Sequence, residues 1–246
     1  RLAINAWVSQ ETVNRINDLI PPGAIDSTTR TVLVNAIHLK LPWYDLFLNT
    51  NTASAPFVKT DGSTVTVPFM NKTTYWSYAE DDTTQAVAIP LSGNTVDFVV
   101  FLPKATSSLA QFEDSLAQGH AQTLVASMTI QDVKLALPKF AFTTAAVRLT
   151  SALKTLGMAG AFDPSADFTG ITQEKPLFIS DVVHKAMVGV DENGVEAAAA
   201  TAVMLAGSGL PTDVKQVTVN RPFFFGIYDR PTSTWIFLGH VTDPSS

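Results

Sequence analysis

The chain has 246 residues, of which 46% are hydrophobic and 15% are charged, and its formal net charge is −6. This composition is typical of a globular protein with a large apolar core. The sixteen basic residues are scattered, which argues against a nucleic-acid interface, and the longest uncharged apolar run, residues 197–207, is too short to span a bilayer. Without cysteine, and with four separated histidines, we expect no disulfide, metal or other cofactor.

The first residue is Arg1, and the chain starts inside an amphipathic helical pattern that we assign to residues 2–20. We therefore expect that an N-terminal portion is missing from this sequence. Residues 31–39 are β-branched and apolar on both faces, which predicts a fully buried strand. Asn35 is the polar exception, and a buried amide needs a hydrogen-bond partner, either as an ordinary core group or within a functional network.

The rest of the chain is rich in predicted strands. Two short helices with a break near Gly119 are predicted between residues 107 and 128. The strand 133–143 contains Pro138, where we expect a kink or a change of sheet. Other strands are predicted at residues 63–70, 85–91, 96–102, 178–190, 214–219, 223–228 and 235–241. The predicted fold class is mixed α+β, dominated by non-local pairing.

The stretch 191–211 has conflicting local preferences. Glu196 followed by four alanines favours a helix. At a period of two, however, one face carries only small or apolar residues, as a buried strand requires: Val195, Ala197, Ala199, Thr201, Val203 and Leu205. Proline is absent until Pro211, so the stretch could join the middle of a sheet. Such local inconsistency tends to mark a functional segment, although an ordinary buried helix is the alternative.

Motifs of catalysis are absent. Residues 207–209 have the wrong spacing for a nucleophile elbow, and no glycine-rich phosphate loop is present. A histidine on an apolar strand, such as His184, is more often a hydrogen-bonded core residue than a catalytic base. We therefore do not expect an enzyme. Residues 71–73 form an N-glycosylation sequon at Asn71, which has meaning only in a secreted eukaryotic protein.

The ordered set of motifs resembles the serpin family. The helix with Asn5-Ala6-Trp7-Val8, the hinge that begins at Glu192 and the closing Asn220-Arg221-Pro222-Phe223 all follow the family pattern. Further blocks that resemble the family are residues 33–37, 153–158, 166–171, 184–186 and 237–241. The resemblance runs from Ile4 to Pro244 and implies a single serpin domain over residues 1–246, truncated at its N-terminus.

The resemblance implies a suicide-type inhibitor of serine endopeptidases. In this mechanism a protease cleaves an exposed reactive-centre loop, here about residues 192–213, and the loop then inserts into the main β-sheet and traps the acyl-enzyme. Insertion needs small, uncharged inward side chains, and the six residues of the alternating face meet this need. The hinge residues that the resemblance assigns are Glu192, Gly194, Val195, Glu196, Ala197, Ala198, Ala199, Ala200 and Thr201.

The scissile bond implied by the resemblance lies near Ser208-Gly209. Counting from the hinge gives Ser208, whereas counting back from residues 220–223 gives a position a few residues later. The candidates are Ser208, Gly209, Leu205, Met204 and Ala206. Small residues there suit an elastase- or subtilisin-like protease, and Met204 or Leu205 suits a chymotrypsin-like one. Because no Lys or Arg occurs between Lys185 and Lys215, trypsin-like targets are disfavoured.

Three further residues match positions that control the sheet of a serpin. Asn35 and His184 match the family's shutter, which lies beneath the point where the main sheet opens. Trp43 matches the breach, where insertion of the loop begins. Loss of His184 is expected to leave Asn35 unpaired at a cost of roughly 1–3 kcal/mol, and to speed conversion to latent or polymeric forms.

The alternatives are a non-inhibitory serpin with a carrier, chaperone or storage role, and an inactive fragment. The family implies an extracellular protein that is monomeric when intact and can polymerise. Without the family's first strands, the strand 31–39 would have an unpaired edge, which favours aggregation.

Overall fold

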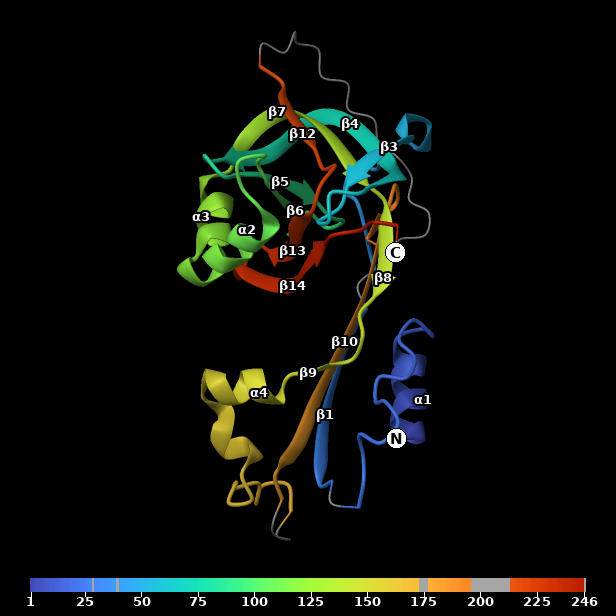
Figure 1. The fold of residues 1–246 in the computed structure, drawn as a ribbon, viewed down its shortest axis with the longest axis vertical. Helices are drawn as coiled ribbons and strands as arrows, with labels where there is room; N and C mark the ends of the chain where they lie inside the picture. The colour runs from blue at the N-terminus through green and yellow to red at the C-terminus, as the bar shows by residue number, and fades with distance from the viewer. Residues whose placement is uncertain (28, 39, 173–176, 196–212, 246) are drawn as a thin grey trace. The chain divides into compact units, whose positions relative to one another are not determined.

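A computed structural model describes residues 1–27, 29–38, 40–172, 177–195 and 213–245, and the mixed α+β fold class is confirmed (Figure 1). The chain folds into two compact units. Unit 1 comprises Arg1–Leu39 and Phe142–Val188, and unit 2 comprises Lys40–Ala141 and Gly189–Ser246. Among the described residues, no helix is long and apolar enough to cross a membrane.

Unit 1 is built around two parallel strands. Strand β1 (Thr31–His38) pairs in parallel with β10 (Ile179–Asp191), whose last residues continue into unit 2. Helix α1 lies beside β1, and the short strand β9 pairs antiparallel with β10 (Figure 1). The bounds of the other elements of unit 1 are α1 Leu2–Glu11, β9 Val147–Arg148, α4 Thr150–Leu153, the π-helix η3 Lys154–Met158 and the 3₁₀ helix η4 Ala159–Phe162.

Helix α1 is shorter than the apolar spacing predicts, because it ends at Glu11 instead of residue 20. Val13, Asn14 and Asp18 have positive φ angles, which an α-helix does not allow. The Thr12 hydroxyl accepts a hydrogen bond from the backbone N–H of Ile16 at 3.0 Å, so a side chain replaces a helical carbonyl there. Of the apolar residues of this segment, Val8, Ile16, Leu19 and Ile20 are buried, as the periodicity predicts, whereas Leu2, Trp7 and Val13 are exposed.

Strand β1 has two unequal faces, which corrects the prediction of a fully buried strand. Val32, Val34 and Ala36 pack with the buried cluster of α1 and residues 16–20. On the other face Leu33 is 43% exposed and Asn35 is also exposed. The sequence could not distinguish these faces because both carry mainly apolar residues.

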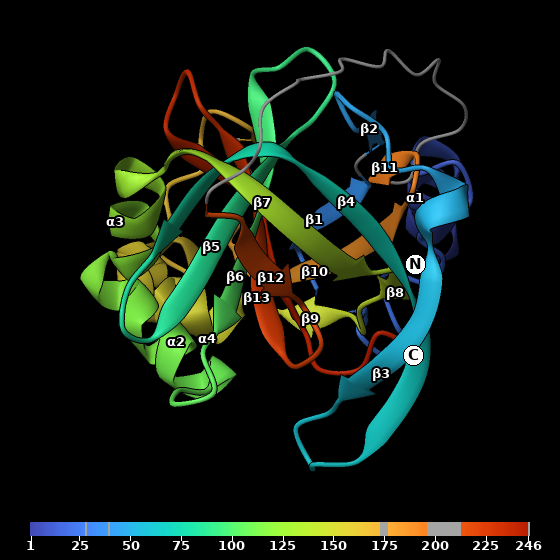
Figure 2. The ribbon, with the colours of Figure 1, turned by 90° about the horizontal axis from the view of Figure 1, so that it is seen from above.

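Unit 2 contains a large sheet in which eight strands pair within the described part of the chain. Its order is β12-β7-β4-β5-β6-β13-β14, with β3 paired to β4. Figure 2 shows β7 running between β12 and β4. The bounds are β3 Ala53–Val58, β4 Thr64–Glu80, β5 Thr84–Pro90, β6 Val96–Pro103, β7 Thr129–Pro138, β12 Lys215–Thr218, β13 Phe223–Asp229 and β14 Thr234–Val241. The C-terminal strands predicted at residues 223–228 and 235–241 are confirmed as the antiparallel pair β13 and β14.

The core of unit 2 is aromatic. Phe98 and Phe225 stack with ring centroids 5.2 Å apart, and both side chains are inaccessible to solvent. Two short helices, α2 (Leu109–Ser115) and α3 (His120–Ser127), cover part of the sheet (Figure 1), and Phe112 of α2 stacks on Phe101 of β6 at 5.0 Å. A short 3₁₀ helix, η2 (Leu116–Gln118), follows α2, and Gly119, at φ +79°, separates it from α3, as predicted.

The chain changes sheet directly after Pro138. Strand β7 ends at this proline and belongs to the large sheet, whereas β8 (Phe140–Thr143) pairs with β10. The predicted kink or change of sheet is thus confirmed as a change of sheet. A proline lacks the N–H that would continue the ladder, so it suits this position. Lys139 lies between the two strands, next to the point where the chain leaves the large sheet.

Candidate functional site

The predicted hinge begins with a tight turn at the end of β10. Strand β11 (Gly194–Val195) folds back antiparallel on β10, with Val190 opposite Val195 and Asp191 opposite Gly194. On its other side β11 pairs with β2 (Leu41–Pro42). Val195 is fully buried. Gly194 and Val195 of the predicted hinge are therefore already in a sheet and already run antiparallel to β10.

Gly194 occupies a position that only glycine suits. Its φ angle is +146°, which residues with a side chain rarely adopt. A Cβ atom placed there would lie 2.4 Å from the carbonyl oxygen of Leu41 and 2.4 Å from the Cα of Pro42. Because these contacts are backbone atoms, no side-chain movement would relieve them. The close pairing of β11 with β2 thus depends on the absence of a side chain.

Glu192 forms a buried ion pair at the tip of the turn. Its carboxylate lies 2.7 Å from the Lys139 ammonium and accepts a second hydrogen bond from the Thr52 hydroxyl at 2.7 Å. The residue is only 5% exposed. Burial raises the pKa of the Glu192 carboxyl, but the hydrogen bonds from Lys139 and Thr52 outweigh burial, so the pKa is lowered overall. The carboxylate is therefore held in its charged form.

Three successive carbonyl groups of this turn are bound by the segment 43–47. The Trp43 indole Nε1–H donates to the carbonyl of Asp191 at 2.7 Å, and the Trp43 backbone N–H donates to the carbonyl of Asn193 at 3.0 Å. The Phe47 backbone N–H donates to the carbonyl of Glu192 at 3.2 Å. Trp43 is 2% exposed and packs edge-on against Phe47 and Phe98. It thus fixes this turn, at the start of the predicted hinge, by both packing and hydrogen bonding.

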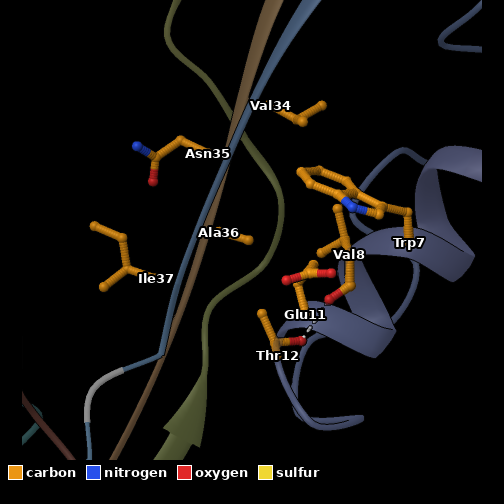
Figure 3. A pocket seen from close by; sticks show the side chains of 8 residues that line it. All are labelled: Trp7, Val8, Glu11, Thr12, Val34, Asn35, Ala36 and Ile37. Atoms are coloured by element: carbon orange, nitrogen blue, oxygen red, sulfur yellow. Dashed lines mark hydrogen bonds between the residues drawn. The ribbon is translucent and has the colours of Figure 1, made fainter.

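Asn35 and His184 are neighbours across β1 and β10. They are register partners, and His184 Nδ1 lies 3.1 Å from Asn35 Oδ1. The apolar strand pattern predicts a buried amide, but Asn35 is exposed and His184 is half-buried. Figure 3 shows why: Val34 and Ala36 point toward α1, whereas Asn35 points to the opposite side of the strand. Their role in a shutter stays a prediction.

We expect His184→Ala to lower the free energy of unfolding by about 0.5–1.5 kcal/mol, the net contribution of an ordinary hydrogen bond. This is less than the roughly 1–3 kcal/mol expected for a buried amide, because water can solvate the exposed Asn35. Urea unfolding of His184→Ala, Asn35→Ala and the double variant measures the effect. If the two residues act together, the double variant loses less than the sum of the single variants. Strictly additive losses would contradict the pairing.

The remaining predicted site residues lie outside the described part of the chain. They comprise the rest of the hinge and all candidates for the scissile bond: Glu196, Ala197, Ala198, Ala199, Ala200, Thr201, Met204, Leu205, Ala206, Ser208 and Gly209. Of the predicted residues that the structure describes, Trp43, Glu192, Gly194 and Val195 come together in unit 2. Asn35 and His184 come together in unit 1.

The partners of Glu192 were not predicted from the sequence. Thr52 is 140 residues away along the chain, and Lys139 follows the end of a strand of the large sheet. No local periodicity or spacing connects positions so far apart. The only local signal for either partner was the position of Lys139 directly after Pro138, where the chain leaves one sheet for another.

Comparisons with known proteins show the family of the chain. A family model described as serpin (serine protease inhibitor) matches residues 1–244. The chain belongs to the serpin family. An uncharacterized serpin-like protein of Thermococcus kodakarensis is 38% identical over 98% of this chain and 56% of its own length. The leukocyte elastase inhibitor of Sus scrofa is 34% identical over 99% of this chain and 66% of its own length.

Solved serpin structures have the same fold. The thermophilic serpin tengpin in its native state gives a TM-score of 0.85 at 30% identity, covering 98% of this chain and 62% of its own. Human thyroxine-binding globulin with its bound ligand also gives 0.85, at 26% identity, covering 99% of this chain and 62% of its own. The chain thus spans about half to two thirds of the length of the serpins that it matches.

Proposed function

We propose that this serpin is a suicide-type inhibitor of serine endopeptidases and not a catalyst. Its loop, residues 192–213, would be cleaved and would then insert between β1 and β10 as an additional strand. The observation that carries this proposal is the antiparallel start of the loop at Gly194–Val195. A strand that continues in this direction between the parallel strands β1 and β10 is antiparallel to both.

Insertion requires β1 and β10 to separate. They are hydrogen-bonded neighbours from Thr31 and Ile179 to His38 and Met187, so the incoming strand must replace each of these backbone bonds. An inserted strand satisfies the ladders of both neighbours, which favours the inserted form. From Val195 to Ser208 an extended strand reaches about 45 Å at ~3.3 Å per residue. That length is sufficient to carry a tethered protease along β10.

The inward face of the loop supports insertion. Val195 is buried and β-branched, and the residues that alternate with it in the sequence, and that would point inward after insertion, are Ala197, Ala199, Thr201, Val203 and Leu205. None of these side chains carries a charge, and burying an unpaired charge would oppose insertion strongly.

We propose an elastase-, subtilisin- or chymotrypsin-like protease as the target. The candidate residues Met204, Leu205, Ala206, Ser208 and Gly209 are small or apolar, and no basic residue is present between Lys185 and Lys215. The similarity to a leukocyte elastase inhibitor supports the elastase class. An extracellular location stays a prediction from the family resemblance, as does the single domain over residues 1–246.

Incubation with elastase, subtilisin, chymotrypsin and trypsin tests the proposal. We expect a covalent complex that survives denaturing gel electrophoresis with at least one of the first three, and not with trypsin. Cleavage of the loop without a complex for all four proteases would contradict the inhibitor function. Sequencing the released C-terminal peptide would identify the scissile bond.

Paired variants test whether insertion causes the inhibition. Ala199→Asp places a charge on the inward face, so we expect cleavage to continue while the covalent complex is lost. Ala198→Asp places the same charge on the outward face, and the complex should persist. Equal amounts of covalent complex for the two variants would mean that the alternating face does not insert.

A non-inhibitory role is the second candidate, because thyroxine-binding globulin and ovalbumin are among the similar structures. Thermal unfolding before and after loop cleavage separates the two functions. An inserting loop adds a strand, so the cleaved inhibitor should unfold at a clearly higher temperature. An unchanged unfolding temperature, together with no complex, would favour the non-inhibitory role.

A further inference from the structure

A cavity of about 420 Å³ lies in unit 2, away from the hinge site. It is formed where several elements end: the turn between β3 and β4, the end of β6, the first turn of α2, the residues before β13 and the end of β14. Its volume is within the range of pockets that bind small organic molecules. Arg221, Leu109, Pro103 and Pro222 are the lining residues that matter most for its chemistry.

Arg221 is the unusual residue of this cavity. Its Nε–H donates to the carbonyl of Pro103 at 2.7 Å, and one terminal nitrogen donates to the side-chain oxygen of Asn220 at 3.3 Å. A guanidinium has five N–H donors, so these two bonds leave most of its donors available. Burial lowers the pKa of Arg221, and no ion pair with a carboxylate is found among the described residues. Within the part of the chain that the structure describes, the group is thus a partly desolvated cation without a counter-charge.

The other ionisable groups that line the cavity, Lys59, Glu113 and His240, have partners at short distance. The Lys59 ammonium lies 3.6 Å from a carboxylate oxygen of Asp243. His240 Nδ1 lies 2.6 Å from a carboxylate oxygen of Glu113. Among the described groups of this lining, Arg221 is therefore the cation without a carboxylate at ion-pair distance. An anion bound there would supply the missing counter-charge and accept the available N–H groups.

The rest of the wall is largely apolar. Pro103, Leu109, Ala110 and Pro222 contribute aliphatic surface to the same lining as Arg221. Leu109 and Ala110 belong to α2, which also packs against β6 and β13, so this wall rests on the core of unit 2. A ligand that binds here needs an anionic end for Arg221 and an apolar body for this surface. An inorganic anion would leave the apolar surface uncovered.

We propose that this cavity is a binding site for a small organic carboxylate with an apolar body. The carboxylate would pair with the guanidinium of Arg221 through two parallel hydrogen bonds, the geometry that this group favours. The apolar body would cover Leu109 and the two prolines. The site is distinct from the hinge and does not depend on whether the loop inserts into the sheet.

Two matched probes test the proposal: 3-phenylpropionate, and its neutral analogue 3-phenylpropanamide. Titrations are followed by ¹H–¹⁵N correlation NMR of the chain. We expect the carboxylate to shift the amide signals of Leu109, Ala110 and Arg221, with a dissociation constant at least about tenfold lower than that of the amide. Equal binding of the two probes, or no shifts at millimolar concentration, would overturn the proposal.

Two variants test the site by independent routes. Arg221→Gln removes the charge and should weaken 3-phenylpropionate binding at least about tenfold, whereas Arg30→Gln, on an exposed surface of unit 1, should not change it. Ala110→Phe fills the cavity from an exposed helix position and should also abolish binding, whereas Ala117→Phe, which lies outside the cavity lining, should not. If Arg221→Gln does not fold, the comparison of Ala110→Phe with Ala117→Phe still tests whether 3-phenylpropionate binds in this cavity. Binding that persists in the folded variants would overturn the proposal.

Discussion

Lys139→Glu is expected to destabilise unit 2 more than any other charge change at the hinge. Glu192 is 5% exposed, and its ion-pair partner within the described ranges is Lys139. Removing one partner of a buried ion pair costs about 3–5 kcal/mol, and we expect the lower end because the Lys139 side chain is 34% exposed. A second carboxylate so close to Glu192 adds repulsion. Urea unfolding followed by tryptophan fluorescence would measure the loss, since buried Trp43 lies beside the turn.

The control for this variant is Lys134→Glu. Lys134 is on strand β7 a few residues before Lys139, but its side chain is exposed. We expect this control to change the free energy of unfolding by less than about 1 kcal/mol. The exchanged pair Lys139→Glu with Glu192→Lys should recover part of the stability. Equal unfolding midpoints for Lys139→Glu and Lys134→Glu would show that the ion pair does not hold the turn.

Acid should reduce the difference between the parent chain and Lys139→Glu. The Glu192 pKa is lowered from its ordinary value of 4.5 in the folded state. A carboxyl with a lowered pKa contributes stability above its unfolded pKa, and this contribution is lost as the pH falls through the folded value. We therefore expect the difference in unfolding free energy to be constant above about pH 5 and to decrease below about pH 4.5. A difference that grows on acidification would contradict the assigned charge state.

Gly194→Ala is expected to be the second large effect. The new Cβ would lie 2.4 Å from backbone atoms of Leu41 and Pro42, and the residue would keep a φ angle of +146° that alanine disfavours. Backbone strain and overpacking together cost roughly 2–5 kcal/mol, so we expect β11 to separate from β2. Amide hydrogen exchange of Val195 would report this directly, and urea unfolding would give the free energy.

Gly62→Ala separates the two causes. Gly62 also has a positive φ angle, +81°, but a Cβ atom added there would meet no other atom within 4 Å. Its substitution should cost only roughly 1–2 kcal/mol, the effect of the left-handed conformation alone. The difference between the two variants measures the close approach of β11 to β2. If Gly194→Ala costs no more than Gly62→Ala, the pairing at the hinge tolerates a side chain.

Local patterns were sufficient for most elements of the fold. Alternation and β-branched residues identified the strands, and the change of sheet at Pro138 followed from the missing N–H of proline. The predictions failed where two local forces compete. Helix α1 ended early because Thr12 and the polar residues after it offered other hydrogen bonds. Strand β1 was assigned as fully buried because its apolar content is similar on both faces.

For the candidate site, too, some features followed from the sequence and others only from the structure. The motif order identified the family, because serpin motifs follow one another in a fixed order along the chain. The hinge and the matching positions Trp43, Asn35 and His184 stay predictions from the same order. Hydrophobic and turn patterns alone would not have assigned these residues a role. The structure then showed that Asn35 is exposed, which sequence periodicity could not predict for a strand with apolar residues on both faces.

By itself, the sequence determined which segments are strands, where the chain turns, and that the stretch from Val195 to Leu205 has one alternating face of small or apolar side chains. Only the tertiary structure decided how the base of the predicted hinge is held. It brings Thr52, Lys139 and Trp43 from three separate segments to the turn at 191–194. The physical reason is that side-chain hydrogen bonds depend on strand register and on the path of the chain between sheets. Neither is encoded in the residues next to Glu192.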